Sequence, residues 1–409
     1  MRNRRLIRAL SALAVTMAAV SCRVALETDF QSAYERTVRR SSVSQMVLVA
    51  MQETPEGETK TSLNGSQVLW NAGDQIKVFN ATNPEGVVFT LKAASAGQSV
   101  GEFTGDVISG EGPFYAVYPA SAAGTLSGTR VSVTVPQVQT LTAGSFGSGA
   151  NLAMTQVNSL SDALHFKNAL GAVCLQLSSS MDATRIRIQT KGTEPLWGNG
   201  TVGMTEGIPV LSLEAGTTDQ QIVEATGAAS GTAFYLMLPP DALASGFIVQ
   251  VAVSDKAMLK EAPASESNKI SRSGIVAMPA FAYQDQLHTA FLDIKPLPFG
   301  YYSGVGENLS YQTLFGFDKA TSSYATKVEL DASRTFRLQD FSEKKMYSFE
   351  LPYTLALGGV YPATLESVLV SAYSAPADAG SFRLVQKTSQ AAWFVKEDFS
   401  FGFIVPLED

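Results

Sequence analysis

Short stretches of alternating apolar and polar residues recur along this chain, with turn residues between them. Val131, Val133 and Val135 alternate with polar neighbours, and so do Ile186 and Ile188. A period of two is that of a half-buried β-strand, and Gly, Asn, Ser and Pro between such runs mark turns. No segment sustains the 3.6-residue apolar period of a long helix. The sequence therefore predicts an all-β protein with few short helices.

The composition favours folded domains and argues against a nucleic-acid partner. Of the 409 residues, 45% are hydrophobic and only 16% are charged, which is typical of globular protein rather than of a coiled coil or a disordered chain. The length predicts two or three domains. Four of the 30 basic residues lie within the first 21 positions, so 26 remain against 37 acidic residues, a net charge of −11. Such a balance repels phosphate backbones.

Residues 1–21 have the layout of an export signal. Four arginines precede a 12-residue, mostly apolar segment from Ala9 to Val20, and Ser21 and Cys22 follow it. That segment is shorter than the roughly 20 residues of a membrane span. A cysteine directly after small residues resembles the lipobox of bacterial lipoproteins, which implies cleavage between Ser21 and Cys22 and lipidation of Cys22. The alternative is an ordinary secretory signal followed by a chance cysteine.

Residues 22–42 are polar and weakly patterned, as in an exposed tether or a propeptide. Arg36, Arg39 and Arg40 lie near the end of this segment. Exposed basic residues there are candidate sites of proteolytic maturation by a trypsin-like or Arg-specific protease. An uncut, flexible tether is the alternative.

A repeated segment suggests two related domains after the tether. Residues 113–119 are echoed by residues 233–239, and an alternating strand follows each of them. We therefore expect tandem antiparallel β-sandwiches of the transthyretin-like or immunoglobulin-like kind at 43–180 and 181–285. Residues 286–409 have denser aromatics and charged turns, which indicates an additional C-terminal β domain.

The segment from Thr59 to Phe79 resembles a known family. It contains a Lys-Thr pair, a short turn, Trp70, the run Ala72-Gly73-Asp74 and then a hydrophobic strand. This order is similar to that of the fimbrillin-like family of Bacteroidetes lipoproteins, the precursors of type V fimbriae. The Phe114–Pro119 stretch and the strand entry at Asn168–Ala172 are also similar to that family. Residues 286–409 carry no motif of it.

The resemblance implies a structural or adhesive fimbrial subunit and not an enzyme. The precursor would reach the outer membrane by its lipid anchor and then face the outside, on the cell surface or in the fimbrium. Stalk subunits of the family are cut after an arginine near the N-terminus, and Arg40 is the best-placed residue here. Loss of the first strand then opens an apolar groove, which a strand of a neighbouring subunit fills. An extra C-terminal domain favours a tip or accessory role over a repeating stalk.

The resemblance also implies the partners. They are other fimbrial subunits, joined by strand addition, and glycans or proteins on host or bacterial surfaces.

Few residues suggest chemistry. His165 and His288 are 123 positions apart, and neither has a Cys or His partner at ligand spacing, so we expect no metal site and no Ser-His-Asp triad. We also expect no cofactor. Cys174 lies in an apolar run and is predicted to be a small buried hydrophobe, with a reactive thiol as the alternative. A glycosidase needs only two carboxylates and is the least favoured hypothesis.

A surface glycan-binding lipoprotein is the second hypothesis for the function. Tyr301 and Tyr302 belong to an aromatic group at the start of the C-terminal part. Exposed aromatic rings can stack on the flat faces of sugars. In the competing interpretation these rings face the core of that domain.

Overall fold

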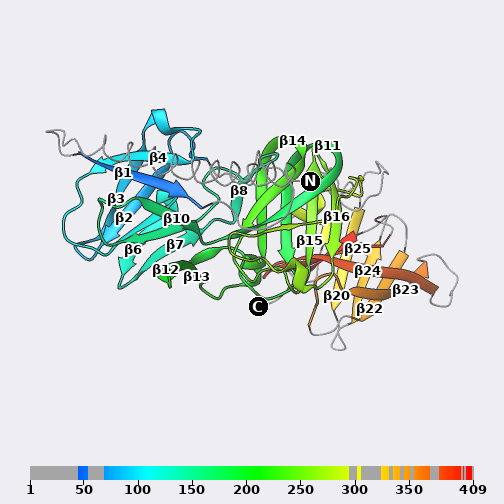
Figure 1. Ribbon diagram of the computed structural model, residues 1–409. Helices are drawn as coiled ribbons and strands as arrows, with labels where there is room; N and C mark the ends of the chain where they lie inside the picture. Colours follow the sequence, from blue (N-terminus) through cyan, green and yellow to red (C-terminus); the bar gives the residue numbers. More distant parts are fainter. Residues whose placement is uncertain are drawn as a thin grey trace, which may run out of the picture.

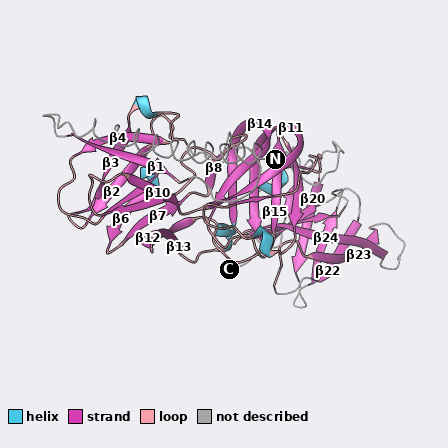
Figure 2. Cartoon of the chain, viewed as in Figure 1, coloured by secondary structure: helices cyan, strands magenta, loops and turns pink. Residues whose placement is uncertain are grey.

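The protein, seen here in a computed structural model, is built almost entirely of strands (Figure 2). The structure describes residues 45–53, 69–293, 302–304, 324–330, 335–340, 345–350, 354–368, 377–397, 399 and 402–407. The α-helix α2 (Thr289–Asp293) has five residues, and no described helix is longer. The predicted all-β class with few short helices is confirmed.

The N-terminal strands form a closed barrel of seven strands. Around the barrel they are β1 (Gln45–Gln52), β10 (Leu164–Asn168), β9 (Ala153–Val157), β5 (Phe114–Tyr118), β2 (Gln75–Asn80), β3 (Asn83–Leu91) and β4 (Val100–Asp106). Strand β1 closes the barrel because it pairs antiparallel with β4 on one side and parallel with β10 on the other. A closed barrel has no free sheet edge, whereas the two separate sheets of a sandwich do have free edges.

Trp70, shortly before β2, fills the centre of the barrel. Its side chain is fully buried. The rings of Phe103, Tyr118 and Phe166 meet the indole edge-on, with ring centroids 4.9, 5.2 and 5.9 Å away. This edge-to-face arrangement is the one that aromatic quadrupoles favour. Trp70 therefore holds together three strands of the barrel from inside.

Strand β5 is buried on both of its faces. Phe114 and Tyr118 face the barrel core, whereas Tyr115 and Val117 pack outward against a four-stranded sheet. The order in this four-stranded sheet is β13 (Ile208–Leu213), β12 (Gly198–Thr205), β7 (Arg130–Val135) and β6 (Ala123–Ser127). Burial on both faces explains why the β5 sequence is continuously apolar rather than alternating.

A third sheet, the central sheet, follows the barrel. Its main order is β18 (Leu287–His288), β16 (Lys256–Ala262), β15 (Phe247–Val253), β11 (Gly171–Thr190), β14 (Ile222–Leu238) and β8 (Val138–Thr140), with β17 (Ile275–Ala277) beside β11. In β11, Ile186 and Ile188 enter a large apolar core, and the alternating polar positions face away from it. The strand predicted from the alternation at Ile186 and Ile188 is therefore present, as part of β11.

The C-terminal sheet consists of eight strands paired in sequence order. They are β19 (Tyr302–Gly304), β20 (Tyr324–Leu330), β21 (Thr335–Asp340), β22 (Lys345–Glu350), β23 (Val360–Val368), β24 (Ala377–Lys387), β25 (Ala391–Lys396) and β26 (Gly402–Pro406). Figure 1 shows the barrel, the central sheet and the C-terminal sheet following one another along the molecule, with β24 and β25 next to the central sheet.

The expected division of residues 43–285 into two domains stays a prediction. Residue 180 lies inside β11, and β7 pairs with β12, which comes later than residue 181. The two echoed segments both form fully buried strand, in β5 and at the end of β14. They lie in different sheets, because β5 pairs with β2 and β9 whereas the end of β14 pairs with β11.

Candidate functional site

Most of the sequence-predicted site residues lie outside the described part of the chain. This holds for the signal cleavage and lipidation site, for the arginines of the tether and for the first of the two tyrosines: Ser21, Cys22, Arg36, Arg39, Arg40 and Tyr301. Tyr302 opens β19, and its side chain is not described. These assignments remain predictions.

The residues weighed for chemistry do not come together. His165 is exposed on β10 of the barrel, and His288 belongs to β18 of the central sheet. Within the described ranges, no three His, Cys, Asp or Glu residues are grouped so that they could hold a metal ion. Cys174 is a free, fully buried thiol in β11, and burial raises its pKa. The predicted buried hydrophobe at Cys174 is confirmed.

The first candidate functional site is the position of strand β1 between β4 and β10, which we call the β1 seat. Seven consecutive residues of β1 pair with β4, and three at its end pair with β10. Leu48 and Ala50 point into the barrel core. The indole Nε1 of Trp70 donates to the Ala50 carbonyl at 3.3 Å. Strand β1, the first described segment of the chain, is therefore held by backbone pairing with β4 and β10 and by its contacts with the barrel core.

An ion pair fixes the C-terminal end of β1. Arg272, in the loop before β17, donates to both carboxylate oxygens of Glu53, at 2.6 and 3.0 Å. The backbone N–H of Asn168, at the end of β10, donates to Glu53 at 2.8 Å, and Arg272 also donates to the Asn168 carbonyl. Burial opposes ionisation of Glu53, but the Arg272 guanidinium and the Asn168 N–H outweigh it and lower the Glu53 pKa. We call these three residues the Glu53 clasp.

The Ala-Gly-Asp run of the family-like motif has a structural role beside the seat. Asp74 is nearly buried, and its carboxylate accepts from the Asn71 N–H at 2.7 Å and from the Tyr118 hydroxyl at 3.1 Å. Gly73 between them has φ +86°, a left-handed conformation that suits glycine. The turn thus places Trp70 under β1. Burial raises the Asp74 pKa, against the opposing effect of the two hydrogen bonds.

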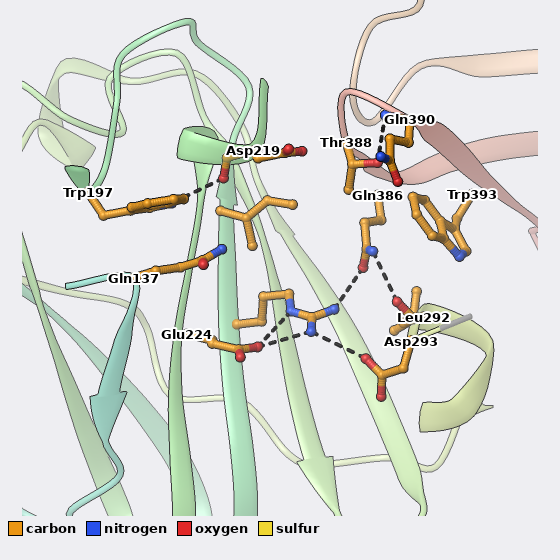
Figure 3. Close-up of a pocket in the computed structure, with 12 residues that line it drawn as sticks. Gln137, Trp197, Asp219, Glu224, Leu292, Asp293, Gln386, Thr388, Gln390 and Trp393 are labelled. Carbon is orange, nitrogen blue, oxygen red and sulfur yellow. Dashed lines mark hydrogen bonds and ion pairs between the residues drawn. The ribbon is translucent and has the colours of Figure 1, made fainter. Parts of the chain in front are cut away.

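The second candidate site is a cavity of about 470 Å³ between the central sheet and the C-terminal sheet (Figure 3). Polar side chains and two tryptophans line most of it. The lining residues are Gln137, Arg187, Trp197, Asp219, Ile222, Glu224, Leu292, Asp293, Gln386, Thr388, Gln390 and Trp393. They come from segments more than 250 positions apart, so sequence reasoning had no local signal to find them.

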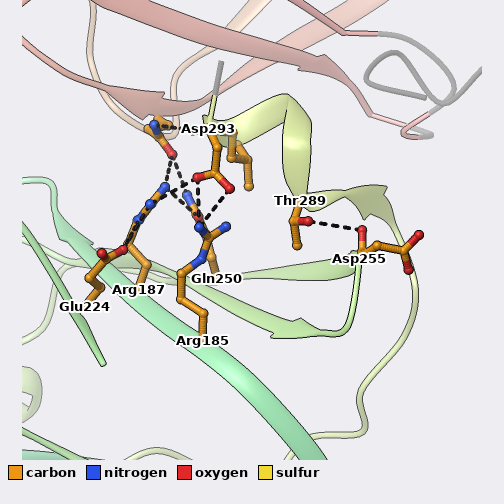
Figure 4. A network of polar contacts seen from close by, with 9 residues as sticks. Arg185, Arg187, Glu224, Gln250, Asp255, Thr289 and Asp293 are labelled. Atoms are coloured by element: carbon orange, nitrogen blue, oxygen red, sulfur yellow. Dashed lines mark hydrogen bonds and ion pairs between the residues drawn. The ribbon is translucent and has the colours of Figure 1, made fainter. Parts of the chain in front are cut away.

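A cross-strand network forms one side of this cavity (Figure 4). Arg187 on β11 stands opposite Glu224 on β14 and Gln250 on β15. Its guanidinium donates to Glu224 Oε2 at 3.1 and 3.0 Å and pairs with Asp293 at 3.3 Å. Arg185, two positions earlier on the same face, donates to both oxygens of Asp293 at 2.8 Å. The arginine charges are therefore matched by neighbouring carboxylates.

The same polar face of the central sheet holds the C-terminal sheet. Buried Gln386 on β24 accepts from Arg187 and Gln250, each at 3.0 Å, and donates to the Leu292 carbonyl. Gln189 makes a reciprocal pair of hydrogen bonds with the backbone of Lys387. The Gln189 side chain thus bonds to the β24 backbone, and the Gln386 side chain reaches from β24 to the central sheet.

None of the described helices is long and apolar enough to cross a membrane.

Comparison with known proteins gives distant similarities only. No family model and no curated protein sequence matches the chain. A candidate cell adhesion protein of Bacteroides ovatus has 13% identity and a TM-score of 0.35 over 55% of this chain and 87% of its own. Another from Bacteroides uniformis has 14% identity and a TM-score of 0.34 over 60% and 96%. The C-terminally truncated tip fimbrial protein Mfa3 of Porphyromonas gingivalis has 9% identity and a TM-score of 0.24 over 54% and 80%. Such scores are too low to assign a fold or a function.

Proposed function

We propose that this chain is a fimbrial subunit of the tip or accessory type, exported as a lipid-anchored precursor and displayed at the cell surface. The leader with its lipobox-like Cys22 and the motif around Trp70 support this proposal. The geometry of the β1 seat adds to the support, because the motif residues are those that place Trp70 against β1.

The seat has the features that strand exchange requires. If β1 left, β4 and β10 would each present unpaired backbone groups, and the barrel core beside Trp70 would lose Leu48 and Ala50. A strand of another subunit with alternating apolar residues could fill that space, with main-chain hydrogen bonds for affinity and side chains for fit. The barrel is thus suited to accept a partner strand once β1 is displaced.

The position of β1 changes the expected role of Arg40. Strand β1 begins at Gln45, after Arg40, so a cut at Arg40 leaves β1 in the mature chain. A break that frees β1 has to fall between Glu53 and Leu69. That stretch contains no arginine, and Lys60 is its single basic residue. A cut at Arg40 by an Arg-specific maturation protease would therefore trim this subunit without opening its barrel, and the position of Arg40 before β1 is the observation that supports the tip or accessory proposal.

Digestion of the full chain with an Arg-specific protease tests the proposal. We expect cleavage within Arg36–Arg40 and a trimmed product that keeps β1, as shown by its intact mass. In the variant Lys60→Arg the same protease should also cut between β1 and β2. A labelled peptide with the sequence of residues 45–53 should then enter the nicked Lys60→Arg chain, and the uncut variant is the matched control.

Two results would contradict the proposal. One is release of β1 from the unmodified chain by the Arg-specific protease under native conditions. The other is a nicked Lys60→Arg chain that takes up no more peptide than its uncut control.

A further inference from the structure

The cavity between the central sheet and the C-terminal sheet has the size of a small-molecule site. Its volume of about 470 Å³ falls within the range of roughly 300–1,000 Å³ that is usual for ligand pockets. One wall belongs to the central sheet and the segments beside it, and the other to β24, β25 and the turn between them (Figure 3). The site thus exists only where the two sheets meet.

Trp197 offers a fixed aromatic surface on the first wall. Its indole Nε1 donates to the Asp219 carbonyl at 3.1 Å, and its own carbonyl accepts from the Gln220 side chain at 2.8 Å. The side chain is only partly buried. Trp393 lies on the opposite side of the cavity, almost fully buried in the C-terminal sheet (Figure 3). An indole that is held in place and lines the cavity can stack on the apolar face of a ring-shaped ligand at little entropic cost.

Two side-chain amides on opposite walls of the cavity are available to form hydrogen bonds with a ligand. Gln137, between β7 and β8, and Gln390, between β24 and β25, both line the cavity. Their side chains make no hydrogen bond to any other described residue. A carboxamide carries both donors and an acceptor, and a hydroxyl group can satisfy either. The two glutamines therefore suit a ligand that is rich in hydroxyl groups.

The charged groups of the cavity already have partners within the protein. Arg187 is paired with Glu224 and Asp293. The carboxylate of Asp219 accepts from the backbone N–H of Ser389 at 2.9 Å and from its hydroxyl at 2.8 Å. No cation among the described lining residues is left to bind an anionic ligand. Glu224 Oε1 has no hydrogen bond to a described residue and can accept one from a ligand hydroxyl.

We propose that this cavity binds an uncharged hexose unit of a glycan, with Trp197 stacked on the sugar ring and Gln137 and Gln390 bonded to its hydroxyl groups. The site goes beyond the fimbrial role and does not depend on strand exchange at the β1 seat. It differs from the glycan contact expected from the sequence at Tyr301 and Tyr302, because it uses both the central and the C-terminal sheet.

The test applies the full chain to an array of neutral and sialylated oligosaccharides. Neutral glycans should bind, and sialylated ones should bind only through a terminal or exposed neutral hexose. Titration with the corresponding free sugar should change the tryptophan fluorescence. The double variant Gln137→Ala/Gln390→Ala should weaken binding at least tenfold without changing the melting temperature, since neither amide has a partner in the fold. Gln156→Ala, on an exposed position of β9, is the matched control and should bind as the unmodified chain does.

Trp197→Phe gives a second measurement, because it keeps an aromatic ring and removes only the indole N–H and part of the stacking area. We expect reduced but measurable affinity. The proposal is overturned if no neutral glycan binds or if the double glutamine variant binds unchanged. It is also overturned if binding is lost only on substitution of Tyr301 and Tyr302.

Discussion

The central sheet is joined to its two neighbours by opposite kinds of surface. On the barrel side the joint is apolar: Phe79, Tyr115 and Met154 of the barrel share one buried cluster with Val133 of the four-stranded sheet and Met237 of the central sheet. On the other side, the joint with the C-terminal sheet is made by arginines, glutamines and carboxylates and contains the cavity. The first joint buries side chains closely, whereas the second leaves room for a ligand.

The difference follows from which strand faces are available. Apolar side chains pack without directional demands and exclude water, which gives a rigid joint. Buried polar groups need partners at set distances, so they fit only at particular points and leave gaps between them. The barrel and the central sheet therefore form a scaffold, and the C-terminal sheet completes a site on it.

The largest expected effect comes from removing a large side chain from the apolar cluster that the barrel, the four-stranded sheet and the central sheet share. Phe79→Ala removes a fully buried ring and leaves a cavity between the barrel and the four-stranded sheet. We expect a loss of about 3–5 kcal/mol in the free energy of unfolding, as measured by urea denaturation. Val88→Ala, on a half-exposed position of β3, is the control and should cost far less. Equal losses for the two variants would show that this joint is not a tightly packed core.

An intermediate effect is expected at the polar joint. Gln386→Ala leaves Arg187, Gln250 and the Leu292 carbonyl each without one hydrogen bond in a buried place. The cost should be about 1–3 kcal/mol in the free energy of unfolding, since unsatisfied buried polar groups carry this penalty. Gln390 is exposed in the turn between β24 and β25 and has no part in that network. Gln390→Ala should therefore leave the free energy of unfolding unchanged. An unchanged stability for Gln386→Ala would mean that the amide does not hold the C-terminal sheet.

The smallest effect, and the one that depends on pH, is expected at the Glu53 clasp. Because the folded-state pKa of Glu53 is lowered, its ionised form stabilises the fold above the ordinary pKa of 4.5, and this contribution is lost as the pH falls through the folded pKa. Glu53→Gln should therefore cost about 1 kcal/mol at pH 7, and this cost should shrink as the pH falls below 4.5. Melting curves of both proteins from pH 3 to pH 7 measure this. If the stability difference between the two proteins instead grew as the pH fell, this prediction would be wrong.

Parts of the fold could be predicted from the sequence because they depend on neighbouring residues. The alternation at Val131–Val135 and at Ile186 and Ile188 marks strands that the structure contains. The Phe114–Tyr118 run is a strand buried on both faces, as its continuous apolarity suggests. By contrast, the parallel pairing of β1 with β10 joins residues more than 110 positions apart, and no pattern along the chain encodes it.

The candidate sites were predicted less well for the same reason. Glu53 and Arg272 are 219 positions apart, and each looks like an ordinary surface charge in the sequence. Arg187 and Gln386 likewise gain their roles only when β24 lies across the polar face of β11. The glycan contact at Tyr301 and Tyr302 rests on local aromatic density and stays a prediction.

The sequence by itself determined that this protein is all-β and where several of its strands lie, since these follow from side-chain period and turn chemistry over a few residues. Only the tertiary structure decided that seven strands close into a barrel around Trp70, that β1 pairs with both β4 and β10, and that the central and C-terminal sheets leave an open cavity between them. Closure, pairing and cavities arise from contacts between distant segments, and their free energy depends on the whole fold rather than on any stretch of the chain.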